Sequence, residues 1–183
     1  MIGRYKKEDW LALGARLLAE EGPPALTVER LTAAAERTRG SFYHHFADRD
    51  AFVRALMERW REQAIEAEGK RYAENETPEA WRKLMRERPF EIDIRFEREI
   101  RRLAASEPIV REILREVDRA RVEGLACLIG QMRPEVEDPQ SLAFVQYCAM
   151  VGAQWLLDDA TDQRLPAIRE TANRLFGIAE PEG

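Results

Sequence analysis

The chain has 183 residues, of which 45% are hydrophobic and 34% are charged, and its formal net charge is −5. This balance excludes an intrinsically disordered protein, because disorder requires low hydrophobicity, and the length suffices for one globular domain or two small ones. The two cysteines, Cys127 and Cys148, stand far apart without a CxxC motif or a Cys/His cluster. We therefore expect buried thiols in a reducing cytoplasm, with a redox switch as the alternative, and the sequence predicts neither a metal site nor a cofactor.

The charge is divided unevenly along the chain. Residues 1–60 carry ten Lys/Arg against nine Asp/Glu, whereas the remaining residues carry nineteen against twenty-five. The cations of the first part gather at the start of the chain and again between residues 37 and 49. Local positive charge governs docking on phosphate, and an acidic remainder limits non-specific binding. The division therefore points to the first sixty residues as a candidate nucleic-acid interface.

Apolar residues recur with helical periodicity through nearly the whole chain, and no alternating pattern of useful length predicts a strand. The first predicted helix stops at Gly22, which precedes two prolines, and Thr27, Asp48 and Asp138 are suitable N-caps for later helices. The predicted helices, about nine in all, are Lys7–Glu21, Val28–Ala35, a short helix before Phe46, one from Asp48 to about Ala73, Glu79–Glu87, about Asp93–Ala105, Glu107–Met132, Gln140–Leu157 and Ala167–Leu175.

Residues Leu26–Phe52 read LTVERLTAAAERTRGSFYHHFADRDAF and contain a helix, a tight turn, a short second helix and a capped third helix. This order is typical of a helix-turn-helix motif, in which the second helix enters the major groove of DNA. The short helix is too polar for a core position, and Gly40 lies where a larger side chain would hold it away from the duplex. Phe42 and Phe46, four residues apart, are expected to anchor its opposite face in the domain.

The same segment resembles the signature of the tetracycline-repressor (TetR) family. In the turn, Glu36 and Arg37 stand where the family usually has Gly and Val. Because Gly adopts a left-handed backbone at no steric cost and Glu does not, we expect a tighter or more helical turn. The signature covers about the first sixty residues, and the remainder resembles the family only in its helical layout. The matching positions are Ala35, Thr38, Gly40, Ser41, Phe42, Tyr43, His45, Phe46, Asp48, Arg49 and Asp50.

The polar side chains around the short helix are the predicted DNA contacts. Arg39 suits bidentate readout of a guanine, with a phosphate contact as the alternative, and Arg49 is expected to reach a phosphate. His45 has a hydrogen bond within its own domain as its alternative. Adjacent histidines point about 100° apart on a helix, so a metal site is disfavoured. The full predicted set is Thr27, Arg37, Thr38, Arg39, Gly40, Ser41, Tyr43, His44, His45 and Arg49.

The helix predicted at Gln140–Leu157 is apolar around most of its circumference, which implies burial against two partners. A second copy of the chain is the economical partner, since a two-fold dimer matches a palindromic DNA site. In the resembling family the last two helices of each protomer form such an interface. The uncharged run Pro139–Leu157 nears membrane-spanning length, but polar residues interrupt it, so no membrane partner is expected. The predicted interface residues are Phe144, Cys148, Val151, Gly152, Trp155 and Leu175.

Aromatic, Met and aliphatic side chains beyond residue 80 are candidates to line a pocket for an apolar small-molecule effector, and a plain hydrophobic core is the alternative. The candidate pocket residues are Trp81, Met85, Phe90, Phe96, Ile100, Leu103, Met132 and Tyr147. Several carboxylates alternate with Arg at helical spacing, which favours solvated ion-pair ladders over acid–base chemistry. These carboxylates belong to Glu97, Glu99, Asp118 and Glu123.

These observations predict an all-α protein with a helix-turn-helix DNA-binding domain at residues 1–50 and a helical ligand-binding and dimerisation domain at residues 51–183. The resemblance implies a cytoplasmic, homodimeric transcriptional repressor that a small apolar ligand releases from its palindromic operator on double-stranded DNA. A helical protein-interaction adaptor that no longer binds DNA is the alternative. The sequence contains no nucleophile–base pair, metal set or phosphate loop, so an enzyme is not expected.

Overall fold

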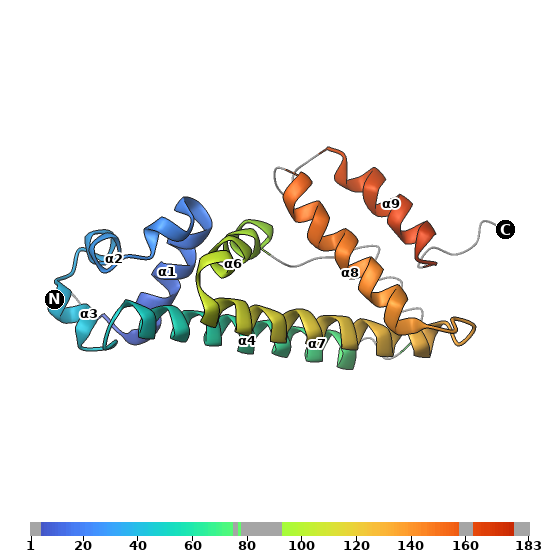
Figure 1. The fold of residues 1–183 in the computed structure, drawn as a ribbon, viewed down its shortest axis with the longest axis horizontal. Helices are drawn as coiled ribbons and strands as arrows, with labels where there is room; N and C mark the ends of the chain where they lie inside the picture. Colours follow the sequence, from blue (N-terminus) through green and yellow to red (C-terminus); the bar gives the residue numbers. More distant parts are fainter. Residues whose placement is uncertain (1–4, 75–76, 78–92, 158–162, 178–183) are drawn as a thin grey trace. The chain divides into compact units, whose positions relative to one another are not determined.

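A computed structural model of the chain describes residues 5–74, 77, 93–157 and 163–177. These residues form helices and turns with no strand among them (Figure 1), which confirms the predicted all-α fold class. The helix predicted at Glu79–Glu87 lies outside the described residues. The observed helices are α1 (Lys7–Glu21), α2 (Val28–Ala35), α3 (Arg39–Tyr43), α4 (Arg49–Glu74), α6 (Ile94–Ser106), α7 (Pro108–Met132), α8 (Pro139–Leu156) and α9 (Leu165–Leu175), with a 3₁₀ turn, η1 (Pro23–Ala25), between α1 and α2.

Side-chain caps set the starts of four helices. Thr27, Thr38, Asp48 and Asp138 each accept a hydrogen bond from the backbone N–H three residues further along the chain, at the starts of α2, α3, α4 and α8. Each cap satisfies a donor that the first helical turn leaves without an intrahelical partner. The caps predicted at Thr27, Asp48 and Asp138 are therefore confirmed.

The chain divides into two compact units. Unit 1 comprises residues 1–63 and 95–116, and unit 2 comprises residues 64–94 and 117–183. Two of the boundaries fall inside the long helices α4 and α7, so each of these helices contributes to both units. This division differs from the predicted boundary at residue 50. The first half of α4, nearly all of α6 and the start of α7 pack with the helix-turn-helix segment, because that segment alone offers too little apolar surface for a core.

Aromatic rings form the centre of unit 1. Trp10 of α1, Phe42 of α3 and Phe52 of α4 are fully buried, and the Phe42 ring centroid lies 5.4 Å from that of Trp10 and 5.6 Å from that of Phe52. Phe46 packs against Phe52 at 5.1 Å, so Phe42 and Phe46 anchor α3 as predicted. α1 and α4 approach so closely that a Cβ added to Gly14 would lie 2.5 Å from the Phe52 ring.

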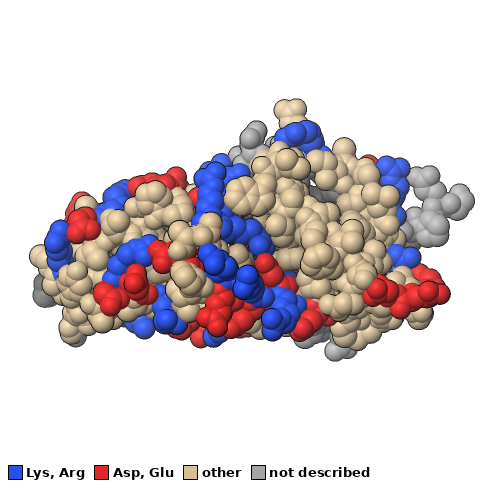
Figure 2. All heavy atoms as spheres, viewed as in Figure 1, with Lys and Arg blue, Asp and Glu red and all other residues tan. Residues whose placement is uncertain are grey.

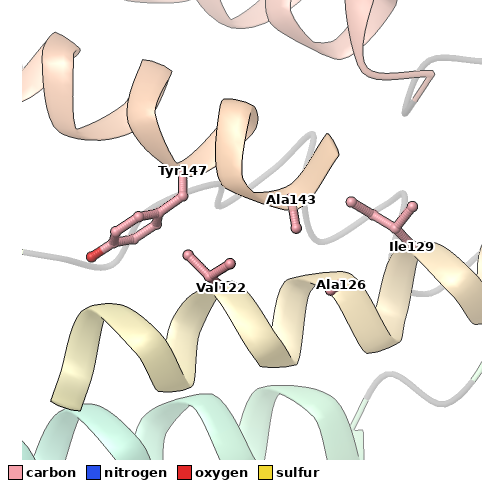
Figure 3. Packing of buried hydrophobic residues seen from close by; sticks show 5 residues of the cluster. All are labelled: Val122, Ala126, Ile129, Ala143 and Tyr147. Carbon is pink, nitrogen blue, oxygen red and sulfur yellow. The ribbon is translucent and has the colours of Figure 1, made fainter. Parts of the chain in front are cut away.

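The described core of unit 2 lies between α7 and α8. Val122, Ala126 and Ile129 of α7 pack with Ala143 and Tyr147 of α8 (Figure 3). The two alanines occupy the middle of the contact, and side chains this small let the two helix backbones approach closely. At one end of the cluster the Tyr147 hydroxyl points away from the aliphatic groups (Figure 3), so this core has an apolar part and a polar margin.

Two expectations about burial are wrong. Cys127 and Cys148 are exposed, because both lie on sides of their helices that no described part of the chain covers. Glu97 and Glu99 are buried rather than solvated, and Glu99 accepts a hydrogen bond from Nη1 of Arg102 at 3.1 Å. Ile100, Leu103 and Ala104 form the buried apolar side of α6, but the alternation of Arg and Glu does not indicate that Glu97 and Glu99 are buried along with it. The packing of α6 into unit 1 therefore decides which charges are buried.

Candidate nucleic-acid interface

The turn of the helix-turn-helix motif keeps a left-handed backbone. Glu36 has φ 52° and ψ 46°, and its N–H donates to the Ala33 carbonyl at 3.2 Å, which ends α2. The expectation of a tighter or more helical turn is therefore wrong. Glu36 adopts the conformation for which Gly is suited, because the chain must leave α2 here in order to start α3 at the Thr38 cap. A side chain in this conformation costs about 1–2 kcal/mol relative to Gly.

Arg37 and His45 hold the start of the chain against the motif. The Arg37 guanidinium lies over the Tyr5 ring, 5.3 Å from its centroid, and Nη1 donates to the Glu36 carbonyl. The Nε2 atom of His45 lies 2.9 Å from the Tyr5 carbonyl oxygen, and the Tyr5 ring also meets Trp10 edge-on at 4.9 Å. Of the two readings given to His45, the structure shows the hydrogen bond within the domain. This contact joins residues 40 positions apart, so no local sequence pattern indicates it.

The outward face of α3 carries most of the other predicted DNA contacts. Phe42 is fully buried and fills the inward side of α3. On the outward side, Arg39, Gly40, Tyr43 and His44 are exposed and Ser41 is half-buried. A Cβ built on Gly40 would meet only the Thr38 hydroxyl, at 3.7 Å, which is an ordinary contact distance. The fold therefore does not require glycine at this position.

Thr27 and Thr38 place two helix starts beside this face. Each hydroxyl caps its own helix, and each helix start presents backbone N–H groups of the kind that bind phosphate oxygens. The Arg39 guanidinium is not alone on the surface, since its Nη2 atom donates to Oε1 of Glu29 at 2.7 Å. This bond joins the first turn of α2 to the first residue of α3. Glu29 is a member of the site that sequence reasoning missed.

Arg49, predicted at a phosphate, has protein partners in the structure. Its Nε atom donates to the Leu26 carbonyl at 2.9 Å, and Nη1 donates to Oε1 of Glu107 at 2.6 Å and to Asp50 at 3.2 Å. Glu107 stands between α6 and α7, so one guanidinium joins the helix-turn-helix segment, the start of α4 and the α6–α7 turn. Arg49 thus positions α4 within unit 1, and any phosphate contact has to use the remaining N–H groups.

The predicted pocket residues are not gathered into one described site. Ile100 and Leu103 are fully buried core residues of unit 1, and Phe96 is half-buried on the same helix. Met132 and Tyr147 belong to unit 2. The other three candidates, Trp81, Met85 and Phe90, lie outside the described residues.

Two polar residues of unit 2, Arg121 and Gln154, are buried although the sequence did not predict it. The Tyr147 hydroxyl donates to Oδ1 of Asp118 at 2.6 Å, and burial raises the pKa of Tyr147 to about 12, against the opposing effect of Arg121. Arg121 is itself buried, and Gln154 is only 3% exposed with an Oε1 atom that has no hydrogen-bond partner. An orphaned buried carbonyl costs about 1–3 kcal/mol. Residues 118–121 of α7 read DRAR, a pattern typical of a solvated charged face. The sequence therefore does not indicate that Arg121 is buried.

A second exposed surface lies on α8 and α9. We call it the apolar face and define it by its large exposed side chains, which are Phe144, Val145, Trp155, Leu156, Ile168 and Leu175. Figure 2 shows a continuous uncharged area over α8. Among the predicted interface residues, Phe144, Cys148, Trp155 and Leu175 are exposed and Val151 and Gly152 are half-buried. A Cβ added to Gly152 would meet nothing within 4 Å, so a neighbouring helix has room to approach there.

Other kinds of site find no support in the parts of the chain that the structure describes. No group of three or more His, Cys, Asp or Glu side chains is arranged there to hold a metal ion. None of the described helices is both long enough and apolar enough to cross a membrane.

Comparison with known proteins places the motif in a family. The family described as "Bacterial regulatory proteins, tetR family" matches residues 11–56, and no curated protein matches the chain. The reduced form of E. coli NemR is 20% identical, with a TM-score of 0.72 over 97% of this chain and 99% of that one. SmeT, the repressor of the Stenotrophomonas maltophilia multidrug efflux pump SmeDEF, is 18% identical (TM-score 0.69; 97% and 95%). A putative transcriptional regulator from Saccharomonospora viridis in complex with choline is 15% identical (TM-score 0.74; 93% and 95%).

The fold and the motif together are those of helical transcription regulators with an N-terminal helix-turn-helix domain. Residues 11–56 match the tetR family of bacterial regulatory proteins, which confirms the resemblance seen in this part of the sequence. The similar solved structures, at 15–20% identity, show that nearly the whole chain shares their fold. They do not carry over a ligand or an operator.

Proposed function

We propose that the protein is a transcriptional repressor that binds a palindromic operator as a homodimer. The observation that carries the proposal is the outward face of α3. It exposes a guanidinium, a phenol, an imidazole and a glycine that the fold does not require, while buried Phe42 fixes the helix from behind. Guanidinium and hydroxyl groups suit phosphates and base edges, and a glycine on this face lets the helix backbone approach the duplex.

Dimerisation is supported by the apolar face. Phe144 and Trp155 on α8 and Leu175 on α9 are 58%, 46% and 75% exposed, which is costly for side chains of this size in water. A second copy covers such a face with an identical one by two-fold symmetry. Two reader helices then need a separation of roughly 34–36 Å in order to enter successive major grooves.

The effector is proposed to bind in unit 2, with Tyr147, Asp118 and Gln154 as polar contacts. Tyr147 and Gln154 are buried, Asp118 is half-buried, and Tyr147 belongs to the aliphatic cluster of α7 and α8. These groups favour a small molecule with an apolar body and at least one hydrogen-bonding group. The similar solved regulator from Saccharomonospora viridis holds a small molecule, choline, which supports a small-molecule effector but not its apolar character. Release from DNA requires the ligand-bound state to bind the operator less well, which is a coupling of about 1–3 kcal/mol.

The route of this coupling is supported by the packing of α6 in unit 1. Glu107, directly after α6, holds Arg49 at the first residue of α4, and Arg49 in turn holds the Leu26 carbonyl next to α2. Buried Glu99 lies against the turn at Gly22, where an added Cβ would be 3.1 Å from its carboxylate. A shift of α4, which contributes residues to both units, therefore also shifts the motif that carries α3.

The test is a selection of bound duplexes from random DNA with the full-length protein, followed by affinity measurements on the enriched sequence. Arg39→Ala is expected to weaken binding by about 1–3 kcal/mol and to relax the preference at one base pair. Arg16→Ala is a matched control, since Arg16 is also exposed and paired with a glutamate, Glu20, but lies on α1. A protein that enriches no sequence and binds DNA without steep salt dependence would instead be the helical adaptor.

A further inference from the structure

The hydrogen bond between Glu29 and Arg39 is the feature of the reader surface that the proposed function leaves unexplained. Arg39 Nη2 and Glu29 Oε1 are 2.7 Å apart, and the two side chains are 65% and 64% exposed. An ion pair this exposed contributes little to folding stability. A carboxylate on a face that meets phosphates also repels the duplex, so its presence there opposes general DNA binding.

The geometry of the bond indicates what it does for Arg39. A guanidinium carries five N–H donors in a planar fork, and the bond to Glu29 uses one donor, on Nη2. The other donors remain for guanine O6 and N7, which Arg grips through two parallel hydrogen bonds. A long side chain that is already held in place loses less conformational freedom when it binds.

We propose that Glu29 is a positioning residue for base recognition: it holds the Arg39 guanidinium for a guanine and lowers the affinity for other sequences. This inference rests on the proposed function, since it needs a duplex that the protein prefers. Two effects of one carboxylate act together. Orientation of Arg39 strengthens the guanine contact, and repulsion of phosphate weakens every complex in which that contact is missing.

The experiment uses the full-length protein and the duplex enriched from random DNA, with each guanine of the half-site replaced in turn, and a random duplex. Kd is measured for the wild type, Glu29→Gln, Arg39→Ala and the double variant. Glu29→Gln keeps the size of the side chain and removes its charge. Its preference for one guanine is expected to fall on the order of tenfold, while its affinity for the random duplex rises about threefold.

The double variant separates positioning from independent readout. If Glu29 acts through Arg39, the guanine preference of the double variant equals that of Arg39→Ala alone. An unchanged preference in Glu29→Gln overturns the inference, as does an additive loss in the double variant, which would mean that Glu29 contacts a base by itself. Glu20→Gln, which removes the same charge from the exposed Arg16–Glu20 pair on α1, is expected to change neither quantity.

Two further readouts keep the outcomes distinct. The melting temperature of Glu29→Gln is expected to stay close to that of the wild type, so a loss of guanine preference is not a loss of folding. A wild-type protein that enriches no sequence contradicts the proposed function itself and the inference with it. A wild type that enriches a sequence without a guanine affected by Arg39→Ala contradicts the inference alone.

Discussion

The outward face of α3 in unit 1 and the apolar face of α8 and α9 in unit 2 are both exposed, but they indicate a partner for different reasons. Trp155 and Phe144 expose apolar surface, and each Å² of it that a partner removes from water stabilises the complex by about 25 cal/mol. The hydrophobic free energy of these side chains is therefore enough to indicate a partner. The polar face of α3 is stable in water. Its evidence is Gly40, a residue that lowers helix stability where the structure leaves room for a side chain.

The largest expected effect comes from a charge in the apolar face. Trp155→Glu is expected to cost the proposed dimer about 2–4 kcal/mol, because an aromatic side chain of the apolar face is replaced by a group that must stay hydrated. Light scattering at micromolar concentration should then report a monomer, and operator affinity should be lost with it. Glu123→Lys, an exposed charge change on α7, is the control and should leave the dimer intact. A wild-type monomer in the same measurement contradicts the assignment of the apolar face.

Gly40→Ala tests the α3 side of the comparison. Alanine is expected to stabilise the fold by about 0.5–1 kcal/mol, since the backbone of α3 is helical and the Cβ meets no clash. Operator affinity is expected to fall on the order of tenfold or more, because the methyl group holds α3 away from the bases. Chemical denaturation and binding titration measure the two quantities on one sample. Unchanged affinity would remove the functional reason for Gly40.

Glu107→Gln sharpens the role given to Arg49. The substitution replaces a charge-assisted hydrogen bond between two partly buried side chains, so a loss of about 1 kcal/mol in unfolding free energy is expected. Glu116→Gln breaks the more exposed pair with Arg61 and should cost less. Equal effects of the two substitutions in urea denaturation would show that the Arg49–Glu107 contact has no special weight.

An effect of similar size on unfolding free energy, and none on a partner, is expected in the turn. Glu36→Gly should stabilise the protein by about 1 kcal/mol, since Gly adopts the left-handed conformation without steric cost. Glu36→Ala changes the charge and keeps the penalty of a Cβ, so it should leave the unfolding free energy nearly unchanged. If Ala stabilises as much as Gly does, the effect is electrostatic and the argument from the backbone fails.

Local patterns in the sequence predicted the parts of the fold that depend on neighbouring residues. The caps at Thr27 and Asp48 and the anchors Phe42 and Phe46 follow from spacing within one or two turns, and each is observed. The left-handed Glu36 was missed, because the intrinsic preference of Glu is overruled by the need to end α2 and start α3 within three residues.

Contacts between distant parts of the chain could not be predicted from the sequence, and they limit how much of the candidate site it reveals. His45 meets the Tyr5 carbonyl, and Arg49 meets Glu107, across 40 and 58 positions of sequence. Burial of Glu97 likewise depends on how α6 packs, which a repeating Arg/Glu pattern does not encode. Side-chain chemistry correctly predicted that Arg39 is polar and exposed. It does not reveal which of the predicted contact residues form hydrogen bonds within the protein, as His45 and Arg49 do.

One measurement tests the central claim most directly: selection of duplexes from random DNA with the full-length protein, read by sequencing and followed by Kd values for the enriched and a scrambled duplex at one salt concentration. The proposal predicts an enriched palindrome whose half-sites lie about one helical turn apart, bound roughly 10³-fold or more tightly than the scrambled duplex. Equal affinity for the two duplexes, or an enriched sequence without two-fold symmetry, would contradict it.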